Sequence, residues 1–310
     1  MKFANVLVVG GSGFIGRHLV AELARRSINV TVPSRRRERA KHLILLPTVE
    51  VVEADVNAPG VLERLARGCQ AVINLVGILH GRFRDAHVEL PLKIVSACRA
   101  AGVKRVLHIS ALGASAGAPS GYLRTKAIGE QALLDADDLD VTTFRPSVVF
   151  GPEDRFLNLF AMLARFLPAL VLACPRARFQ PVYVGDVARV MATALGERSS
   201  HGKSYELCGP GKYSLEELVE LACAASGRRR PVIGLSDRLS YLQAWLMEWS
   251  PGPLMTRDNY FSMQVPNVCA EGCTLPFGIV PQALEAIAPA YLAPSGPRER
   301  YPQLRWRARR

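Results

Sequence analysis

The sequence predicts an α/β fold: a doubly wound parallel sheet in the first half of the chain, followed by a smaller lobe. Two observations support this prediction. In the first half, short β-branched runs alternate with helix-like segments, the order typical of parallel strands joined by crossover helices. In the runs NVLVV, AVINLV and RVLHIS, hydrophobicity is continuous rather than alternating, which indicates strands covered on both faces.

The same patterns place the individual elements in order along the chain. The expected strands are 6–9, 30–33, 49–54, 71–76, 105–109 and 141–145, with helices between them. After Pro146, Gly and Pro clusters separate four expected helices, at 156–167, 187–195, 215–226 and 238–249. We therefore expect a dinucleotide-binding domain at 1–150, a smaller C-terminal substrate lobe at 151–293 interleaved with it, and a flexible basic tail at 294–310.

Composition narrows the possible partners. The chain has 310 residues, 49% of them hydrophobic, which is enough for a large core and excludes global disorder. Its 39 Lys and Arg against 27 Asp and Glu give a formal net charge of +12, which favours an anionic partner such as a phosphorylated cofactor or an acidic membrane surface. The basic tail has no nucleic-acid-binding fold beside it, so we expect no nucleic-acid partner.

The cysteines and the N-terminus indicate a reduced, cytoplasmic environment. Seven scattered cysteines favour free thiols over a disulfide framework, and Cys269 and Cys273 form the only close pair, so no structural metal is expected. The first residues enter a short strand-like run with no signal-length apolar region. The apolar segment 156–174 approaches the length of a membrane span, but Arg165 and Pro168 oppose insertion, leaving peripheral contact at the inner membrane face as the alternative.

A glycine-rich loop between the first strand and the first helix predicts a dinucleotide site. In GGSGFIG, the glycines Gly10, Gly13 and Gly16 allow a tight turn and close approach of a pyrophosphate. The phosphate charge would lie against the N–H groups at the helix start, around Phe14 and Ile15. The alternative is an ordinary glycine turn.

The end of the second strand predicts NADP(H), with NAD(H) less favoured. An NAD site would carry an acidic residue here, whereas this chain has Ser34, Arg35 and Arg36. A guanidinium group suits a 2′-phosphate, so Arg35 is the leading contact, Arg36 supports it and Ser34 could donate a hydrogen bond. The alternative is a solvated basic turn.

Tyr122 and Lys126, in YLRTK, stand four residues apart at the start of the helix after the fifth strand. This spacing places both side chains on one helix face. Lys126 could hydrogen-bond a nicotinamide ribose and lower the pKa of the phenol, so that Tyr122 transfers a proton as hydride moves. The alternative is that Lys126 only anchors the cofactor while Tyr122 packs.

Two further features are interpreted as structural. Asp186 in VGDVA is expected to be a helix N-cap rather than a catalytic acid. Trp245 and Trp249 share a helix face that is expected to pack into the second lobe. If that face is exposed, it favours a membrane interface or a quinone-like ligand instead.

Together these motifs resemble the short-chain dehydrogenase/reductase superfamily over nearly the whole chain. RPSVVFGPEDRF and QPVYVGDVA look like its extended and atypical branches, which include nucleotide-sugar epimerases and reductases. INLVGIL, YLRTKAIGE and FGPEDRFLN are similar to the atypical branch that contains the NADPH-binding accessory subunit of the respiratory complex I alpha subcomplex. A coenzyme Q synthesis accessory protein belongs near the same branch.

The resemblance implies a Rossmann-type fold and roles for individual residues. The pyrophosphate would lie on the three glycines, the 2′-phosphate at Arg35, the adenine beside Asp55 and Val56, the cofactor close to Gly77, and the nicotinamide near Pro146. The departure is the catalytic hydroxyl: Ala111 occupies the position of the family's Ser or Thr, and Ser110 lies one residue earlier. If Ser110 points into the fold, its triad with Tyr122 and Lys126 is incomplete.

Two functions remain open on this evidence. The first is an accessory or assembly factor of a quinone-linked membrane system, either complex I or ubiquinone biosynthesis, that holds NADPH structurally. Its partners would be complex I or quinone-biosynthesis proteins and an anionic membrane. The alternative is an NADPH-dependent reductase or nucleotide-sugar epimerase/dehydratase that uses Tyr122 and Lys126 on an unidentified small molecule.

Overall fold

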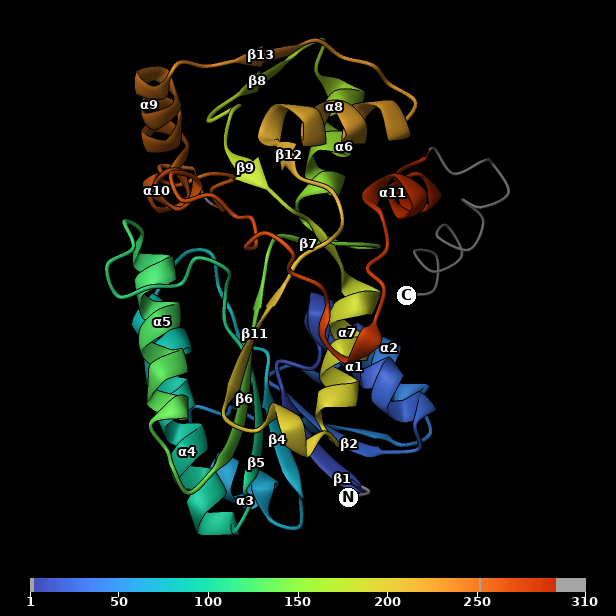
Figure 1. Cartoon of the computed structure of the whole chain (residues 1–310), viewed down its shortest axis with the longest axis vertical. Helices are drawn as coiled ribbons and strands as arrows, with labels where there is room; N and C mark the ends of the chain where they lie inside the picture. Colours follow the sequence, from blue (N-terminus) through green and yellow to red (C-terminus); the bar gives the residue numbers. More distant parts are fainter. Residues whose placement is uncertain (1–2, 251, 294–310) are drawn as a thin grey trace.

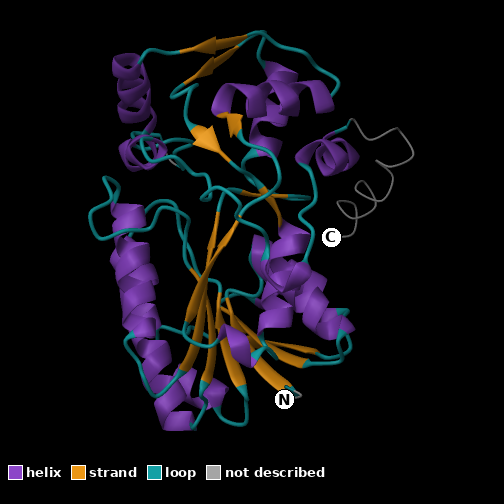
Figure 2. Cartoon of the chain, in the orientation of Figure 1, coloured by secondary structure: helices purple, strands orange, loops and turns teal. Residues whose placement is uncertain are grey.

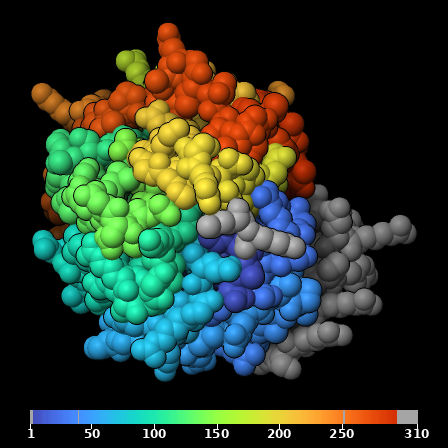
Figure 3. Space-filling view, turned by 60° about the horizontal axis from the view of Figure 1, so that its bottom comes forward, coloured from blue at the N-terminus to red at the C-terminus, as the bar shows by residue number. Residues whose placement is uncertain are grey.

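The structure is a computed structural model and describes residues 3–250 and 252–293. The basic tail expected at 294–310 lies outside the described residues. The described chain has a large sheet with its helices at one end and a smaller group of helices and short strands at the other (Figure 1). In the space-filling view, the last described segments, in red, lie at the top, and the first segments, in blue, lie below them (Figure 3).

A seven-stranded parallel sheet in the order β11-β6-β5-β4-β1-β2-β3 confirms the predicted fold class. Six strands correspond to the predicted ones: β1 (Asn5–Val9), β2 (Asn29–Ser34), β3 (Val49–Glu53), β4 (Ala71–Asn74), β5 (Arg105–Ile109) and β6 (Asp140–Pro146). The seventh, β11 (Lys203–Leu207), pairs with the outer edge of β6 and was not predicted.

Helices cover both faces of this sheet (Figure 2). On one face lie α1 (Phe14–Arg25), the short η1 (Arg37–Ala40) and α2 (Lys41–Ile44), and α7 (Val184–Ala194); on the other lie α3 (Val61–Ala66), the π-helix η2 (Asp85–Glu89), α4 (Leu90–Ala101) and α5 (Gly121–Leu134). Alternate strand residues supply the two cores: Val6 and Val8 enter the first, Leu7 and Val9 the second.

The second lobe is built around a separate core that includes Phe150, Leu157 and Leu218. Its helices are α6 (Leu157–Phe166), α8 (Leu215–Ala225), α9 (Asp237–Met247), α10 (Arg257–Met263) and α11 (Leu284–Leu292). The short helices η3 (Arg198–Ser200) and η4 (Pro276–Gly278) contact the large domain instead: Ser200 Oγ accepts from Arg105 on β5 (2.8 Å), and Phe277 packs against the first core. Three two-stranded sheets pair β7 (Val149–Phe150) with β10 (Val182–Tyr183), β9 (Arg178–Phe179) with β12 (Tyr213–Ser214), and β8 (Leu170–Leu172) with β13 (Val232–Gly234). Within the described ranges, no helix combines the length and the apolar character that crossing a membrane requires.

Two structural expectations are wrong. Asp186 is not an N-cap, because α7 begins at Val184 and places Asp186 inside its first turn. There its carboxylate accepts the Gln282 N–H (2.7 Å) and pairs with Arg189, which fastens the C-terminal segment to the helix. The expectation of free thiols fails for Cys208 and Cys269, which form a disulfide across 61 residues of sequence. Spacing could not reveal this pair because the fold alone brings the two segments together.

Candidate cofactor site

The glycine loop sits at the carboxyl edge of the sheet, between β1 and α1. Gly10 has φ +85°, and a Cβ there would lie 3.1 Å from the carbonyl carbon of Leu75. A Cβ on Gly16 would lie 2.4 Å from the Gly10 carbonyl oxygen, so the loop closes only without side chains. Gly13 precedes α1 and offers no side-chain cap, which leaves the N–H groups of Phe14 and Ile15 for an anion. This is the arrangement that a pyrophosphate requires.

The arginines follow β2, which is the parallel neighbour of β1, so they share an edge of the sheet with the glycine loop. Arg35 and Arg36 are exposed and available to a phosphate. Ser34 is different: it is buried, and its hydroxyl donates to the Arg36 carbonyl (2.9 Å). The proposed role of Ser34 as a phosphate donor therefore competes with its role in shaping the turn.

The remaining predicted cofactor contacts lie at the ends of the next strands. Asp55, exposed after β3, accepts the Asn57 N–H (3.0 Å), and the half-buried Val56 packs against the second core. Gly77 follows β4, and a Cβ on it would lie 3.2 Å from the Lys126 Nζ. Pro146 ends β6, and its carbonyl accepts the Leu112 N–H (3.0 Å). Because all these strands are parallel, the residues gather along one edge.

Lys126 is buried and makes two hydrogen bonds to the backbone. Only 2% of it is exposed, and its Nζ donates to the carbonyls of Val76 (3.0 Å) and Ile109 (3.1 Å), at the ends of β4 and β5. Burial lowers the pKa of Lys126 to about 8, although the negative charge of Glu130 acts to raise it. Lys126 thus ties together the edge on which a cofactor would lie.

Tyr122 does not have the lowered pKa that the Tyr-Lys spacing predicts. Burial raises the pKa of its phenol to about 12. Its backbone N–H donates to a carboxylate oxygen of Asp258 on α10 (3.1 Å), and the other oxygen accepts the Gly121 N–H (2.6 Å). A residue of the second lobe therefore fixes the start of α5 and the position of Tyr122.

The hydroxyl expected beside Tyr122 is replaced by a methyl group. Ala111 belongs to a small apolar cluster against which Tyr122 packs, together with Val265 from the second lobe. Ser110 is 3% exposed, and its Oγ has no hydrogen-bond partner among the described residues. Tyr122 therefore packs beside the methyl group of Ala111, and the Ser110 hydroxyl is buried.

Two neutral histidines, which sequence reasoning left without a role, support this region. His87, in η2, accepts the Ile78 N–H at Nε2 (3.1 Å), so its Nδ1 carries the proton toward Thr125 Oγ1 (3.0 Å). Burial, followed by the charge of Lys126, lowers the pKa of His87 to about 3. The His87 ring lies edge-on to Tyr122 at 5.5 Å, so the loop carrying Gly77 is held against α5.

The second histidine, His108 on β5, is held in the same way. Asn74 accepts the Val76 N–H through Oδ1 (3.1 Å) and therefore donates its amide to His108 Nδ1 (3.1 Å). Burial, then Lys126 and His87, lower the pKa of His108 well below its usual value. These partners are 34 residues apart, so no local spacing signals them.

The segment FGPEDRF contacts the glycine-loop helix. Arg17, in the first turn of α1, pairs with Glu153, which follows β7. The next residue, Asp154, is buried and caps α6 by accepting the N–H groups of Phe156 (2.9 Å) and Leu157 (2.7 Å). The motif thus links the cofactor edge to the second lobe, although sequence reasoning gave it no such role.

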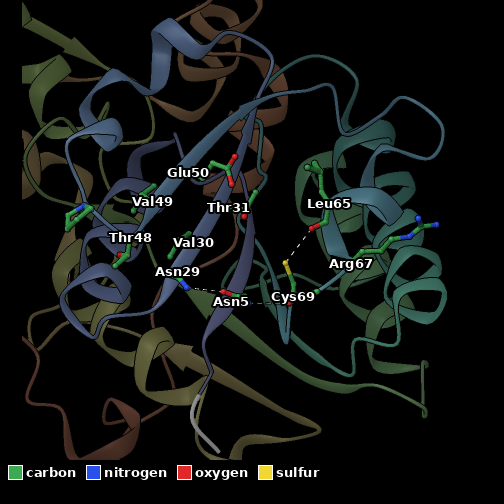
Figure 4. Close-up of a pocket in the computed structure, with 12 residues that line it drawn as sticks. Asn5, Asn29, Val30, Thr31, Thr48, Val49, Glu50, Leu65, Arg67 and Cys69 are labelled. Atoms are coloured by element: carbon green, nitrogen blue, oxygen red, sulfur yellow. Dashed lines mark hydrogen bonds between the residues drawn. The ribbon is translucent and has the colours of Figure 1, made fainter.

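Two cavities lie away from the glycine loop. One, of about 510 Å³, is lined by residues at the amino ends of the strands, among them Asn5, Asn29 and Glu50 (Figure 4). The opposite edge carries the glycines, so this cavity is not the dinucleotide site. The other, of about 800 Å³, lies in the second lobe and is lined by Arg176, Asp237 and Gln264 among others.

Comparisons with known proteins agree with this arrangement. The model of the NAD dependent epimerase/dehydratase family matches residues 6–208. The chain is similar to NADH dehydrogenase (ubiquinone) 1 alpha subcomplex subunit 9, mitochondrial, of Arabidopsis thaliana, with 37% identity over 69% of this chain and 56% of that protein. It is also similar to the ceramide reductase of Caulobacter vibrioides, with 34% identity over 59% of this chain and 58% of that protein. The match thus spans less than two thirds of either relative.

A solved structure with the same fold is the dTDP-glucose 4,6-dehydratase DesIV of Streptomyces venezuelae with NAD and TYD bound. It aligns with a TM-score of 0.67 and 23% identity, over 76% of this chain and 85% of that one.

Proposed function

Because this chain belongs to the NAD dependent epimerase/dehydratase family, we propose that it holds NADP(H) structurally and serves as an accessory or assembly factor of a quinone-linked membrane system. The observation that carries the proposal is the methyl group of Ala111 packed beside Tyr122. Without a hydroxyl there, and with the pKa of Tyr122 raised to about 12, proton transfer to a substrate carbonyl is poorly supported. The cofactor edge, by contrast, is intact.

The residues fit a bound dinucleotide. The glycine loop closes only without side chains, the N–H groups at the start of α1 suit a pyrophosphate, and Arg35 and Arg36 suit a 2′-phosphate. When bound, the cofactor supplies hydride chemistry if a substrate is present and stabilises the fold by mass action whether or not one is. Lys126 orders the strand ends beneath it.

Arg35→Ala tests the preference for the phosphorylated cofactor. Losing a charge-assisted contact worth about 1.5–3 kcal/mol should weaken NADPH binding roughly ten- to a hundredfold and leave NADH binding unchanged. Arg67→Ala is the control, because Arg67 is also exposed but lines the cavity at the opposite edge of the sheet. Isothermal titration calorimetry with both nucleotides measures these affinities. An equal loss of affinity for NADPH and for NADH in Arg35→Ala would contradict the preference for NADPH.

The quinone-linked system is proposed from the Arabidopsis relative, whose name describes a complex I subunit. Affinity capture of the tagged full chain from gently solubilised native membranes, with mass spectrometry of proteins and nucleotide, tests it. Stoichiometric recovery of complex I or quinone-synthesis proteins together with NADPH is expected. Recovery of the chain with cofactor alone would contradict the accessory role.

Peripheral contact with an anionic membrane is part of the proposal and rests on an apolar surface at the end of the second lobe. We call this surface the distal patch; it comprises Phe166, Val171, Ile233, Leu246 and Trp249. β8 and β13 are paired, and Gln243 on α9 donates to the Val171 carbonyl (3.3 Å), so these segments adjoin. The expected packing of the tryptophan face into the lobe is wrong, since Trp249 is 78% exposed. Exposed arginines, Arg165, Arg228, Arg229 and Arg238, lie on the same elements or beside them.

A reductase or epimerase remains the second candidate, favoured by the relative named ceramide reductase and by the Tyr-Lys pair of the sequence. Tyr122→Phe separates the two functions in a deletion strain. Complementation by this variant is expected for an accessory factor, whereas its loss with a normal melting temperature would favour the enzyme. Tyr241→Phe, on a half-exposed tyrosine of α9, is the matched control.

A further inference from the structure

Three cysteines and a glutamate from separate segments meet beside the outer strand of the sheet. Glu206 on β11 and Cys208 just after it are two residues apart, so their side chains leave the same face. Cys269 and Cys273 come from the segment that follows α10. Ligand atoms of Glu206, Cys269 and Cys273 all lie within 4.8 Å of one another, and Cys208 is bonded to Cys269.

Hydrogen bonds between the Gln180 side chain and the backbone hold the two segments of this cluster together. The Cys269 N–H donates to Gln180 Oε1 (3.0 Å), and the Gln180 amide donates to the Gly209 carbonyl (2.7 Å), next to Cys208. A turn with Gly272 at φ +73° reverses the chain direction, so that Cys273 lies beside Cys269 and Glu206. Both halves of the cluster are therefore joined by hydrogen bonds that do not depend on the disulfide.

We propose that this cluster is a zinc site when the Cys208–Cys269 disulfide is reduced. An added dithiol supplies the two electrons and two protons that convert the disulfide to two thiols, and is itself oxidised to a disulfide. Three thiols then lose their protons on binding Zn²⁺ and, with the carboxylate of Glu206, provide four protein ligands.

The geometry and the chemistry fit Zn²⁺. Ligand atoms around a tetrahedral zinc lie about 3.5–3.8 Å apart, because Zn–S bonds are about 2.3 Å long. The ligand atoms of Glu206, Cys269 and Cys273 lie within 4.8 Å of one another, and Cys208 is bonded to Cys269, so all four are close to this spacing. A sulfur-rich tetrahedral set is typical of zinc, and four protein ligands make the site closed and structural. Among the described residues, no other group of three or more His, Cys, Asp or Glu ligand atoms converges in this way.

The site would act on the loop that borders Tyr122. Val265, which packs with Ala111 and Tyr122, lies four residues before Cys269, and Leu112 packs directly against Cys208 and Cys269. Either the disulfide or the metal would tie this loop to β11. Reduction without metal would leave only the hydrogen bonds of Gln180 to hold it there.

Cobalt titration of the reduced full chain tests the proposal. The protein is reduced with a dithiol under argon, alkylation of a denatured sample confirms that all seven cysteines are free, and Co²⁺ is added after the dithiol is removed. We expect the visible ligand-field and sulfur-to-metal bands of tetrahedral cobalt at one equivalent, and their loss on addition of one equivalent of Zn²⁺.

Variants decide whether the bands come from this cluster. Cys273→Ser should abolish them, while Cys69→Ser, on a half-buried cysteine outside the cluster, should retain them. Glu206→Gln keeps every thiol and should weaken binding by more than the roughly 10–100-fold that loss of an outer-shell partner costs. Absence of bands in the reduced wild type, or their persistence in Cys273→Ser with native circular dichroism, would overturn the proposal.

Discussion

Gly16 is the residue on which closure of the dinucleotide loop depends most. A glycine within a helix normally gains stability when it becomes alanine, by about 1 kcal/mol. At Gly16, however, the new Cβ would lie 2.4 Å from the Gly10 carbonyl oxygen and 2.6 Å from the Gly11 Cα, both backbone atoms that cannot move aside cheaply.

Gly16→Ala should therefore destabilise the fold by about 1–3 kcal/mol, the usual cost of overpacking, and abolish nucleotide binding. Urea unfolding and NADPH titration measure the two effects. Gly117→Ala is the control, because a Cβ there would meet nothing within 4 Å. If Gly16→Ala has the stability and the NADPH affinity of the wild type, the loop leaves room for a side chain at this position.

His87 makes the stability of the fold depend on pH. Its pKa is about 3 in the fold and 6.5 as the reference value, so below pH 6.5 the unfolded chain binds the extra proton first. The free energy of unfolding should fall as the pH drops from 6.5 toward 3, by at most about 1.4 kcal/mol per pH unit from this residue.

His87→Gln removes this contribution, because glutamine can accept the Ile78 N–H without titrating. Urea unfolding at pH 7, 6 and 5 should show a smaller loss of stability in the variant than in the wild type. His80→Gln, on an exposed histidine, should follow the wild type. Identical pH profiles for His87→Gln and the wild type would mean that the pKa of His87 is the same in the folded and unfolded chain.

Helix α6 depends on one carboxylate that precedes it. Asp154 accepts three backbone N–H groups at the helix start through Oδ1, and the Tyr291 hydroxyl of α11 through Oδ2 (2.8 Å). The same side chain therefore caps α6 and attaches the last described helix. Its loss should affect the whole second lobe.

Asp154→Asn should cost about 1.5–3 kcal/mol of stability, the range for hydrogen bonds to a charged group. Thermal unfolding of the full chain, followed by circular dichroism, measures it. Asp138→Asn is the control, because Asp138 is a half-exposed partner of Arg99 and its pair should contribute little. Equal melting temperatures for the two variants would contradict the capping role.

The predictability of each element follows from how much of its surface is buried. The central strands β4 and β5 are buried at every position and consist mostly of apolar residues, so the sequence identifies them. The strand β11, KSYEL, lies at the edge with Lys203 and Ser204 exposed, and its sequence lacks that signal. Likewise α10 is short and polar, and α11 contains Pro289, so neither has the periodicity of a predicted helix.

Some features of the candidate site can be predicted from the sequence, and others cannot. The glycine loop, the arginines and the Tyr-Lys pair are local patterns, and sequence alone identifies them. The neutral state of His87, the capture of α5 by Asp258 and the meeting of Cys208 with Cys269 depend on partners distant in the chain. Such partners become visible only when the strands are assembled.

At the level of the whole molecule, the cofactor edge and the distal patch lie on different parts of the protein. The dinucleotide residues border the sheet, whereas the residues of the distal patch lie on or next to α6, β8, β13 and α9 of the second lobe (Figure 1). A membrane could therefore contact the patch without covering the glycine loop. Cofactor and membrane binding should be independent.

Vesicle co-sedimentation tests the membrane contact. The full chain should bind vesicles containing anionic lipid more strongly than neutral ones, because arginines adjoin the patch. The double variant Leu246→Ser with Trp249→Ser should lose most of this binding while NADPH affinity stays the same. Leu45→Ser, on an exposed leucine of the first half, is the control, and equal losses in both would exclude the distal patch.

Because β11 comes late in the sequence, the sheet cannot be completed early in synthesis. When the chain has emerged only as far as β7, six strands can assemble, but the outer edge of β6 still exposes a row of unpaired N–H and C=O groups. Its partner, β11, follows more than fifty residues later, after α6 and α7. At a synthesis rate of about 5–20 residues per second, the open edge persists for several seconds, long enough to pair with another nascent chain. Chaperone demand should therefore peak while the ribosome is translating the second lobe.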